Sequence, residues 1–197
     1  QFVRDKWTNL NGEWLFMYDD QNVGVENKWQ DDPSHYQKTI QVPFVYQSAE
    51  SGIGDRTPHD IVWYMREFEV SYSKHERVLL HFGAVDYEAD IYINGQHVKN
   101  HIGGHTSFEV DITHQLLDGG PQRVAVRAYD RHDDESTPRG KQFWEAESAA
   151  IWYTNSTGIW QTVWLEVVQD SYLQKTKLVP RFDAGKIDNT AEVNQVI

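Results

Sequence analysis

The feature that most constrains the fold is the segment 91–98, which reads Ile-Tyr-Ile-Asn-Gly-Gln-His-Val. Its Asn94-Gly95 pair stands between two short runs in which apolar and polar side chains alternate. Asn and Gly tolerate the positive φ angles of a type I′ turn, and the twist of that turn suits two antiparallel strands. The segment therefore predicts an antiparallel β-hairpin.

The same alternation with a period of two occurs along much of the chain. In the segment 107–112, the side chains of Phe108, Val110 and Ile112 fall on one face, and the polar side chains fall on the other. Successive side chains of a strand point to opposite faces, so this pattern predicts a strand with one buried face. The strands predicted in this way are 14–18, 39–42, 62–70, 78–82, 89–93, 107–112, 124–128 and 163–167.

Helical patterns are weak by comparison. The best is a short turn at 114–117, with Thr113 as its expected cap. Many strands, frequent turn signals and few helices predict an all-β fold, either an antiparallel sandwich or a barrel. The 197 residues can bury an apolar core without a disulfide or a structural metal.

The pattern of strands changes near the C-terminus. The last sandwich strand is expected to end around 170–173, and the segments 175–183 and 191–197 are expected to be two further strands. Two strands cannot form a core of their own. We therefore expect residues 1–172 to form one domain and residues 173–197 to be the truncated start of a second.

Charge and composition narrow the classes of partner. The chain has 18 Lys and Arg against 30 Asp and Glu, a net charge of −12, and no basic run. Nucleic acid and anionic lipid would repel it, so we expect neither nucleic acid nor a membrane as a partner. The absence of cysteine favours a reducing compartment. We expect a cytoplasmic protein, with secretion as the alternative if a leader was removed before Gln1.

Seven short motifs follow one another between residue 9 and about residue 168. They are NLNGEW (9–14), VP (42–43), VWYMREF (62–68), LHFGAVDY (80–87), ING (93–95), GGHTSFEVDI (103–112) and GIWQTVWL (158–165). In this order they resemble the N-terminal sugar-binding domain of glycoside hydrolase family 2. That family includes β-galactosidases, β-glucuronidases and β-mannosidases.

The resemblance implies a jelly-roll β-sandwich of the galactose-binding type, with residues 173–197 opening an immunoglobulin-like domain. It also implies a (β/α)8 barrel further along the parent protein, where two glutamates hydrolyse a β-glycoside with retention of configuration. One of them protonates the leaving oxygen and the other attacks the sugar. In the family the acid/base glutamate usually follows an Asn, and this chain has no Asn-Glu pair. We expect the parent protein to be a glycosidase and this chain to hold no catalytic residue, cofactor or metal.

The resemblance also implies two sugar-contacting positions. One is an amide shortly after the Val-Pro motif, and here the segment after Val42-Pro43 reads Phe-Val-Tyr-Gln. The other is an Asp six residues before the Gly of the Gly-Ile-aromatic motif, where this chain has Trp152, or Ala150 if two extra residues are allowed. Neither Trp152 nor Ala150 carries the carboxylate, so the family's sugar contacts are not transferred to this sequence. Either this branch of the family contacts its sugar differently, or another acid such as Glu145 or Glu147 substitutes.

The long interruption at 131–150 is the main candidate for a functional loop. Loops of this length in compact domains usually have a function of their own. Aromatic faces stack on the apolar faces of sugar rings, so we expect Trp144, Trp152 and Tyr153, together with Glu145, to bind substrate. The aromatic residues expected instead to fill or cover the core are Trp14, Trp63 and Trp164.

Two groups of residues suggest metal sites, and neither is favoured. His97, His101 and His105 are spaced four apart, but four residues of strand span about 13 Å, too far to share one ion. His105 is expected to pack beside Phe108. The second group could chelate calcium, although a solvated acidic loop is the preferred interpretation. Its members are Asp130, Asp133, Asp134 and Glu135.

Two other functions fit the same fold, because a fold alone does not determine function. The chain could be an autonomous carbohydrate-binding module with a sugar site on its own surface. It could also be a structural spacer that carries an oligomer interface.

Overall fold

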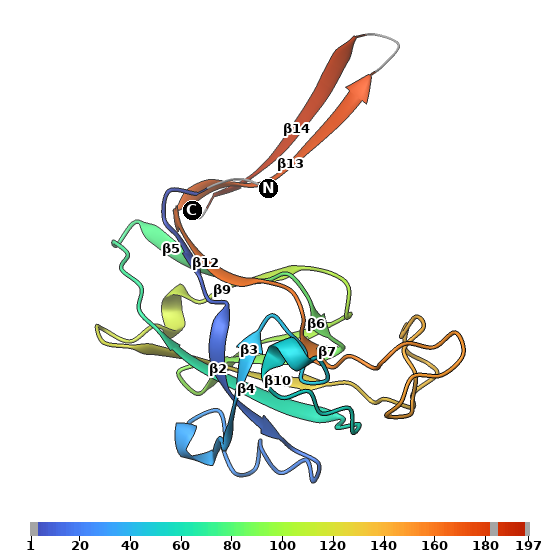
Figure 1. The fold of residues 1–197 in the computed structure, drawn as a ribbon. Coiled ribbons are helices and arrows are strands. Elements are labelled where there is room, and N and C mark those ends of the chain that lie inside the picture. Colours follow the sequence, from blue (N-terminus) through green and yellow to red (C-terminus); the bar gives the residue numbers. More distant parts are fainter. Residues whose placement is uncertain (1–3, 182–184, 196–197) are drawn as a thin grey trace.

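The computed structural model describes residues 4–181 and 185–195, and within them the fold is built from strands (Figure 1). The strands are β1 (Trp7–Asn9), β2 (Gly12–Tyr18), β3 (Lys38–Val42), β4 (Ile61–Phe68), β5 (Glu76–Phe82), β6 (Val85–Asp86), β7 (Glu88–Ile93), β8 (Gln96–Ile102), β9 (Phe108–Asp111), β10 (Gln122–Tyr129), β11 (Gly158–Ile159), β12 (Val163–Gln169), β13 (Ser171–Arg181) and β14 (Lys186–Gln195). Three short 3-10 helices join them: η1 (Pro33–His35), η2 (Ala49–Ser51) and η3 (Thr113–Gln115). None of the helices in these two ranges is long and apolar enough to cross a membrane.

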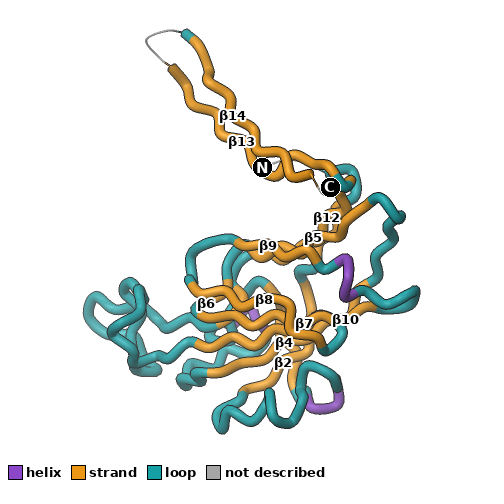
Figure 2. Tube along the Cα trace, turned by 180° about the vertical axis from the view of Figure 1, so that it is seen from behind, coloured by secondary structure: helices purple, strands orange, loops and turns teal. Residues whose placement is uncertain are grey.

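Two antiparallel sheets pack face to face (Figures 1 and 2). One has six strands in the order β3-β2-β4-β10-β7-β8, and the other has four in the order β1-β12-β5-β9. All of these neighbours are antiparallel. The short strands β6 and β11 pair with each other beside the two sheets. The predicted all-β class and the antiparallel jelly-roll sandwich are confirmed, and each predicted sandwich strand overlaps a strand of the structure.

The hairpin at Asn94-Gly95 is confirmed as the connection between β7 and β8. Asn94 and Gly95 have φ angles of 49° and 82°, the positive values that the turn requires. The Asn94 side chain donates hydrogen bonds to the carbonyl of Gln115 and to Oε1 of Gln122, each 2.8 Å long. It also accepts one from the backbone N–H of Arg123. The turn is therefore fixed to η3 and to the start of β10.

The main core lies between the two sheets and is made by alternate side chains of their strands. Its largest members are fully buried, and they include Trp14, Phe16, Tyr64, Leu80, Phe82, Ile91 and Leu165. The inward face predicted for 107–112 is confirmed, since Ile112 is fully buried and Phe108 and Val110 pack against this core. Trp14 fills the core as expected.

A second apolar cluster covers the outer face of the six-stranded sheet. Trp63 and Met65 of β4 are buried there under the segment 19–37, which contributes Trp29 and Tyr36. The indole Nε1 of Trp63 donates a 3.0 Å hydrogen bond to Asp19. Both faces of β4 are consequently buried, which explains its nearly continuous apolar sequence.

Two predictions made from the sequence for this part of the fold are wrong. Thr113 does not cap the turn before β10. It is the first residue of η3, and its Oγ1 accepts a hydrogen bond from Val78 N–H. His105 lies against Trp160, with ring centroids 5.8 Å apart, and it is His101 that stacks on Phe108 at 4.0 Å.

The last two strands form a hairpin that projects from the sandwich (Figure 1). β13 begins at Ser171 and β14 at Lys186, so both start earlier than the predicted 175–183 and 191–197. Residues 182–183 and 196–197 of those predicted strands lie outside the described residues.

Candidate functional site

The segment 131–157 forms a long loop at one end of the sandwich (Figure 1). It leaves the end of β10 and returns to β11. Two backbone hydrogen bonds of 2.8 Å close it on itself, from Phe143 N–H to the Tyr153 carbonyl and from Tyr153 N–H to the Lys141 carbonyl. These two bonds close the segment into a loop with a defined tip.

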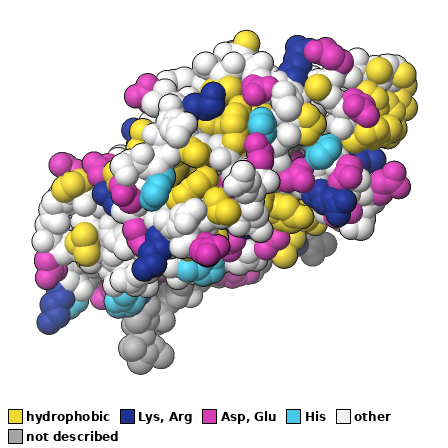
Figure 3. Space-filling model, turned by 90° about the horizontal axis from the view of Figure 1, so that it is seen from below, with side chains coloured by type: hydrophobic (Ala, Val, Ile, Leu, Met, Phe, Trp, Pro, Cys, Tyr) yellow, Lys and Arg dark blue, Asp and Glu magenta, His cyan; other side chains and the backbone are white. Residues whose placement is uncertain are grey.

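Three aromatic rings pack together on this loop. The ring centroids of Trp144 and Trp152 are 5.4 Å apart with the planes inclined at 64°. Phe143 lies 4.5 Å from Trp144 and 6.4 Å from Trp152, and the Arg139 guanidinium sits 5.2 Å from the Trp144 ring. Trp144 is 36% exposed. Hydrophobic side chains gather at this end of the molecule in Figure 3.

The structure brings together two of the four residues predicted to bind substrate. Trp144 and Trp152 are in ring contact. Glu145 is exposed beside Trp144, whereas Tyr153 is 68% exposed and makes none of these ring contacts. The alternative acid, Glu147, forms an ion pair of 3.1 Å with Arg56, which connects the loop to the segment after β3. Whether these residues bind sugar stays a prediction.

A buried group of polar side chains holds the returning arm of the loop. Gln47, from the segment after Pro43, donates through Nε2 to Oδ1 of Asn155 at 2.9 Å and to Oγ1 of Thr157 at 3.4 Å. Its Oε1 accepts from the Thr157 N–H at 3.4 Å. Thr157 Oγ1 also lies 3.1 Å from Asp130 Oδ2 and 3.1 Å from Asn155 Oδ1. All four side chains are buried.

A second group holds the outgoing arm. Gln142 donates through Nε2 to Oδ2 of Asp86 at 2.9 Å. Its Oε1 accepts from the N–H and hydroxyl of Ser156 at 2.7 and 3.1 Å, and from Nδ2 of Asn155 at 3.3 Å. Gly104 makes room for Asp86, because a Cβ at Gly104 would lie only 2.1 Å from Asp86 Oδ1.

The two carboxyl groups in these networks are both perturbed by their surroundings. Burial, assisted by the nearby charge of Asp86, raises the pKa of Asp130 to about 7. Burial also raises the pKa of Asp86, against the hydrogen bonds from Gln142 and Ser156, which lower it. A buried carboxyl with a raised pKa tends to keep its proton near neutral pH.

Sequence reasoning missed this pair of networks. Gln47 occupies the position after Val42-Pro43 where the family resemblance implies an amide, and that was the one signal available for it. The structure uses the amide to hold the loop. Asp86 lies 56 residues before Gln142, and Asn155 lies 13 residues after it. No spacing pattern in the sequence connects the three.

The structure does not assemble either of the metal sites considered. Asp133 pairs with Arg131 at 2.7 Å, Asp134 accepts hydrogen bonds from Ser136, and Asp130 points into the buried network. His97 lies 3.0 Å from Asp90. Across residues 4–181 and 185–195, no cluster of three or more His, Asp and Glu side chains is placed to hold a metal ion.

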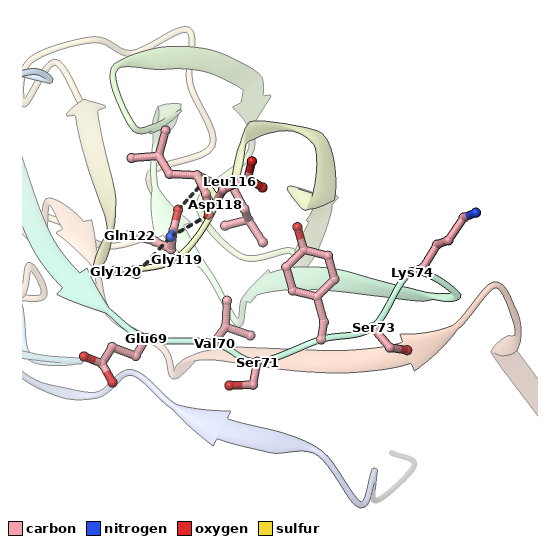
Figure 4. Close-up of a pocket in the computed structure, with 12 residues that line it drawn as sticks. Glu69, Val70, Ser71, Ser73, Lys74, Leu116, Asp118, Gly119, Gly120 and Gln122 are labelled. Carbon is pink, nitrogen blue, oxygen red and sulfur yellow. Dashed lines mark hydrogen bonds between the residues drawn. The ribbon is translucent and has the colours of Figure 1, made fainter.

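A separate cavity of about 580 Å³ lies at the opposite end of the six-stranded sheet (Figure 4). Along the β4–β10 pairing, Ile61 lies opposite Tyr129 at the end next to the long loop. Phe68 lies opposite Gln122 at the other end, where the cavity is. The cavity is lined by the segments 69–74 and 116–120 together with Gln122. The amide of Gln122 is occupied by the backbone of Leu117 and Gly120, as the dashed lines of Figure 4 show in part.

Comparison with known proteins agrees with this architecture. Residues 7–165 match the family model described as "Glycosyl hydrolases family 2, sugar binding domain". The chain belongs to this family. The sugar-binding domain is 28% identical over 174 residues to a β-galactosidase of Thermoanaerobacter pseudethanolicus, an alignment that covers 87% of the domain's chain. It is 31% identical over 134 residues, or 68% of the chain, to a β-glucuronidase of Paenibacillus borealis.

A solved structure shows the same relationship. The sugar-binding domain superposes on a β-glucuronidase from an uncultured Clostridium species with a TM-score of 0.74 and 25% identity, over 98% of this chain and 35% of that one. The chain spans 22% of the length of each of the two curated relatives named above. It therefore corresponds to one part of these larger proteins.

Proposed function

We propose that this chain is the non-catalytic N-terminal domain of a β-galactosidase-like or β-glucuronidase-like enzyme that hydrolyses β-glycosides with retention. In this role it supports the catalytic barrel and lends the loop 131–157 to one wall of the substrate cleft. The observation that carries the proposal is the packed pair Trp144 and Trp152, presented on a loop whose two arms are held by buried hydrogen bonds. Rigid aromatic surfaces of this kind suit the apolar faces of sugar rings.

The proposed parent enzyme has further domains, and the projecting hairpin supports this. Paired residues of two strands lie on the same face of the hairpin, and so do alternate residues of one strand. In β13–β14, Leu173 pairs with Val193, Leu178 with Asn189 and Pro180 with Ile187, and these three pairs are on one face. Most apolar side chains of the hairpin therefore share that face. Leu173, Leu178, Ile187 and Val193 are exposed. An exposed apolar strand face is a liability unless something covers it. We therefore propose a domain boundary at residue 172, with residues 173–197 opening an immunoglobulin-like domain that precedes the barrel.

The proposed partners follow from charge and composition. A β-glycoside is the substrate of the complete enzyme, and a chain with net charge −12 is not suited to nucleic acid or to an anionic membrane. We propose a cytoplasmic location on the ground that these 197 residues contain no cysteine, with secretion as the alternative.

Kinetics of the parent enzyme test the proposal. Trp144→Ala and Trp152→Ala should each lower kcat/KM for an aryl β-galactoside or aryl β-glucuronide about tenfold, which corresponds to roughly 1.4 kcal/mol of transition-state binding. Trp7→Ala is the matched control, because Trp7 is 46% exposed on β1, away from the loop. If kcat/KM is unchanged in both Trp144→Ala and Trp152→Ala, the loop does not form part of the substrate cleft. The chain alone should hydrolyse neither substrate.

The cavity at the other end of the sheet favours a second candidate, an autonomous carbohydrate-binding module. Tyr72 is 38% exposed there, and Glu69, Lys74 and Asp118 supply polar groups around it. A sugar site commonly combines an aromatic face with such groups. Titration of the chain with a panel of oligosaccharides separates the two functions. Saturable binding that Tyr72→Ala abolishes supports the module, and binding that Trp144→Ala abolishes supports the loop.

A further inference from the structure

The orientations of three amide side chains around the loop arms are fixed by backbone N–H groups, which can only donate. Ser156 N–H points at Oε1 of Gln142, and Thr157 N–H points at Oε1 of Gln47. Since Gln142 presents its oxygen, Asn155 must face it with Nδ2, as observed at 3.3 Å. Oδ1 of Asn155 therefore faces Gln47 and Thr157 and can only accept.

The hydroxyl of Thr157 then lies between two oxygens with a single hydrogen to give. Oδ2 of Asp130 and Oδ1 of Asn155 are each 3.1 Å away. The other polar neighbours are the Nε2 donor of Gln47 and the hydroxyl of Tyr46, whose own hydrogen goes to the Thr57 carbonyl. If Asp130 were ionised, one of the two oxygen–oxygen contacts would contain no proton. If Asp130 carries a proton, it donates to Thr157, Thr157 donates to Asn155, and both of these oxygen–oxygen contacts are hydrogen bonds.

The surroundings of Asp130 disfavour a negative charge. Its side chain is buried, with 7% of the residue exposed, and the charges that act on it are those of the carboxylates Asp86 and Asp60. Burying a carboxylate without a cation is costly, and such a group takes up a proton instead.

We propose that Asp130 is held as a neutral carboxylic acid whose proton positions the loop 131–157, so that ionisation of this one group loosens the returning arm and shifts Trp144 and Trp152. Asp130 is thus a positioning residue that acts through Thr157 and Asn155. Its effect on substrate rests on the proposed function, whereas its protonation does not. The raised pKa of the group, about 7, agrees with the proton count.

The sign of the pH dependence follows from the raised pKa. The neutral form favours the docked arm, so docking is complete at acid pH and is lost as the pH rises through about 7. Four other titratable groups face this region: Asp86 on β6, Asp60 before β4, Tyr46 in the segment after β3 and His105 before β9. Asp86 is hydrogen-bonded by Gln142 and Ser156. Asp60 lies 2.6 Å from the ring of His132. Ionisation of Asp130 places a new charge next to Asp86 and Asp60, which opposes docking.

Carbon-detected NMR of the chain tests this without any sugar. The carboxyl carbon of Asp130 should titrate near pH 7, and the indole N–H signals of Trp144 and Trp152 should shift with the same midpoint. In Asp130→Asn, whose amide donates to Thr157 as the neutral acid does, the indole signals should keep their acid positions from pH 5 to pH 8. Asp133→Asn, on the same loop but exposed and paired with Arg131, is the control and should leave the titration unchanged.

Two results would overturn the proposal: an Asp130 carboxyl that is already ionised at pH 5.5, or indole signals that do not move through its titration. Both are read in the native sequence, so a variant that fails to fold leaves the test intact. An Asp130 carboxyl that titrates near pH 7 together with the indole signals, combined with unchanged kinetics of both Trp144→Ala and Trp152→Ala in the parent enzyme, would contradict the proposed function and leave the role of Asp130 standing.

Discussion

The carboxylate of Asp86 accepts a 2.9 Å hydrogen bond from the side-chain amide of Gln142, which lies 56 residues further along the chain. Asp86 belongs to β6, beside the two sheets, and Gln142 belongs to the outgoing arm of the long loop. This bond, together with those that Gln142 accepts from Ser156 and Asn155, joins the two arms to each other and to the sandwich.

Removing the Gln142 amide should therefore destabilise the domain. Gln142→Ala leaves Asp86 buried with its main donor missing, and the expected loss in free energy of unfolding is about 1–3 kcal/mol. Urea unfolding at pH 7 measures it, and limited proteolysis should cut the loop faster. Gln37→Ala, at an exposed loop position, is the control and should change the stability by less than about 0.5 kcal/mol. Equal stability of the two variants would mean that the Gln142 contacts contribute nothing.

Gly104 should not accept a side chain. The Cβ of Gly104→Ala would lie 2.1 Å from Asp86 Oδ1 and 2.7 Å from its Cγ, so either the carboxyl or the strand must move. We expect a loss of about 1–3 kcal/mol, typical of overpacking. Gly119→Ala is a useful comparison, because nothing lies within 4 Å of that site and only its positive φ of 78° opposes the change. Its cost should be about 1 kcal/mol. If Gly104→Ala unfolds at the same midpoint temperature as the native chain, the expected steric clash with Asp86 does not occur.

Asp19 should be essential for the second apolar cluster. Its carboxylate accepts hydrogen bonds from Val23 N–H, Gly24 N–H and Trp63 Nε1 at 2.8, 2.9 and 3.0 Å. Asp19→Ala leaves these buried donors unsatisfied, and the expected loss is about 2–4 kcal/mol. The exposed Asp118→Ala should be neutral in the same denaturation experiment. If Asp19→Ala unfolds cooperatively with the same urea midpoint as the native chain, these hydrogen bonds do not stabilise the cluster.

His81 should make the domain less stable in acid. Its ring stacks on Trp164 at 4.8 Å, on the outer face of the four-stranded sheet, and burial lowers its pKa despite the nearby carboxylates Glu166 and Glu109. A histidine with a lowered pKa is more easily protonated when unfolded, so stability falls as the pH drops below its ordinary value of about 6.5.

The urea midpoint should accordingly fall less between pH 7 and pH 5 in His81→Gln than in the native chain. The exposed His114→Gln should retain the native pH dependence. If His81→Gln and His114→Gln give the same slope, His81 is not the group responsible.

Local rules sufficed to predict most of the sandwich. Alternation located the strands because one face of each is buried, and the Asn94-Gly95 turn could be read from two residues. β1 was missed because three residues carry no periodicity, and Trp63 was expected near the core without any sign that a second cluster exists. That cluster depends on the segment 19–37 folding over β4, which no local pattern specifies.

The candidate site was predictable only in part. The length and aromatic content of the loop pointed to Trp144 and Trp152, but the groups that hold it are far apart in the sequence. Gln47 and Asn155 are separated by 108 residues, and their contact exists only after both sheets have formed. A pairwise hydrogen bond between distant polar residues leaves no trace in composition or spacing.

The chemistry of the loop attachment also determines how it responds to ionic strength. Gln47, Asn155 and Thr157 are electrically neutral, and dissolved ions do not screen hydrogen bonds between neutral buried groups as they screen exposed charge pairs. The surface pair of Arg56 with Glu147 should weaken in concentrated salt, whereas the buried arm should not. The returning arm of the loop should therefore keep its position in concentrated salt as well as in dilute buffer.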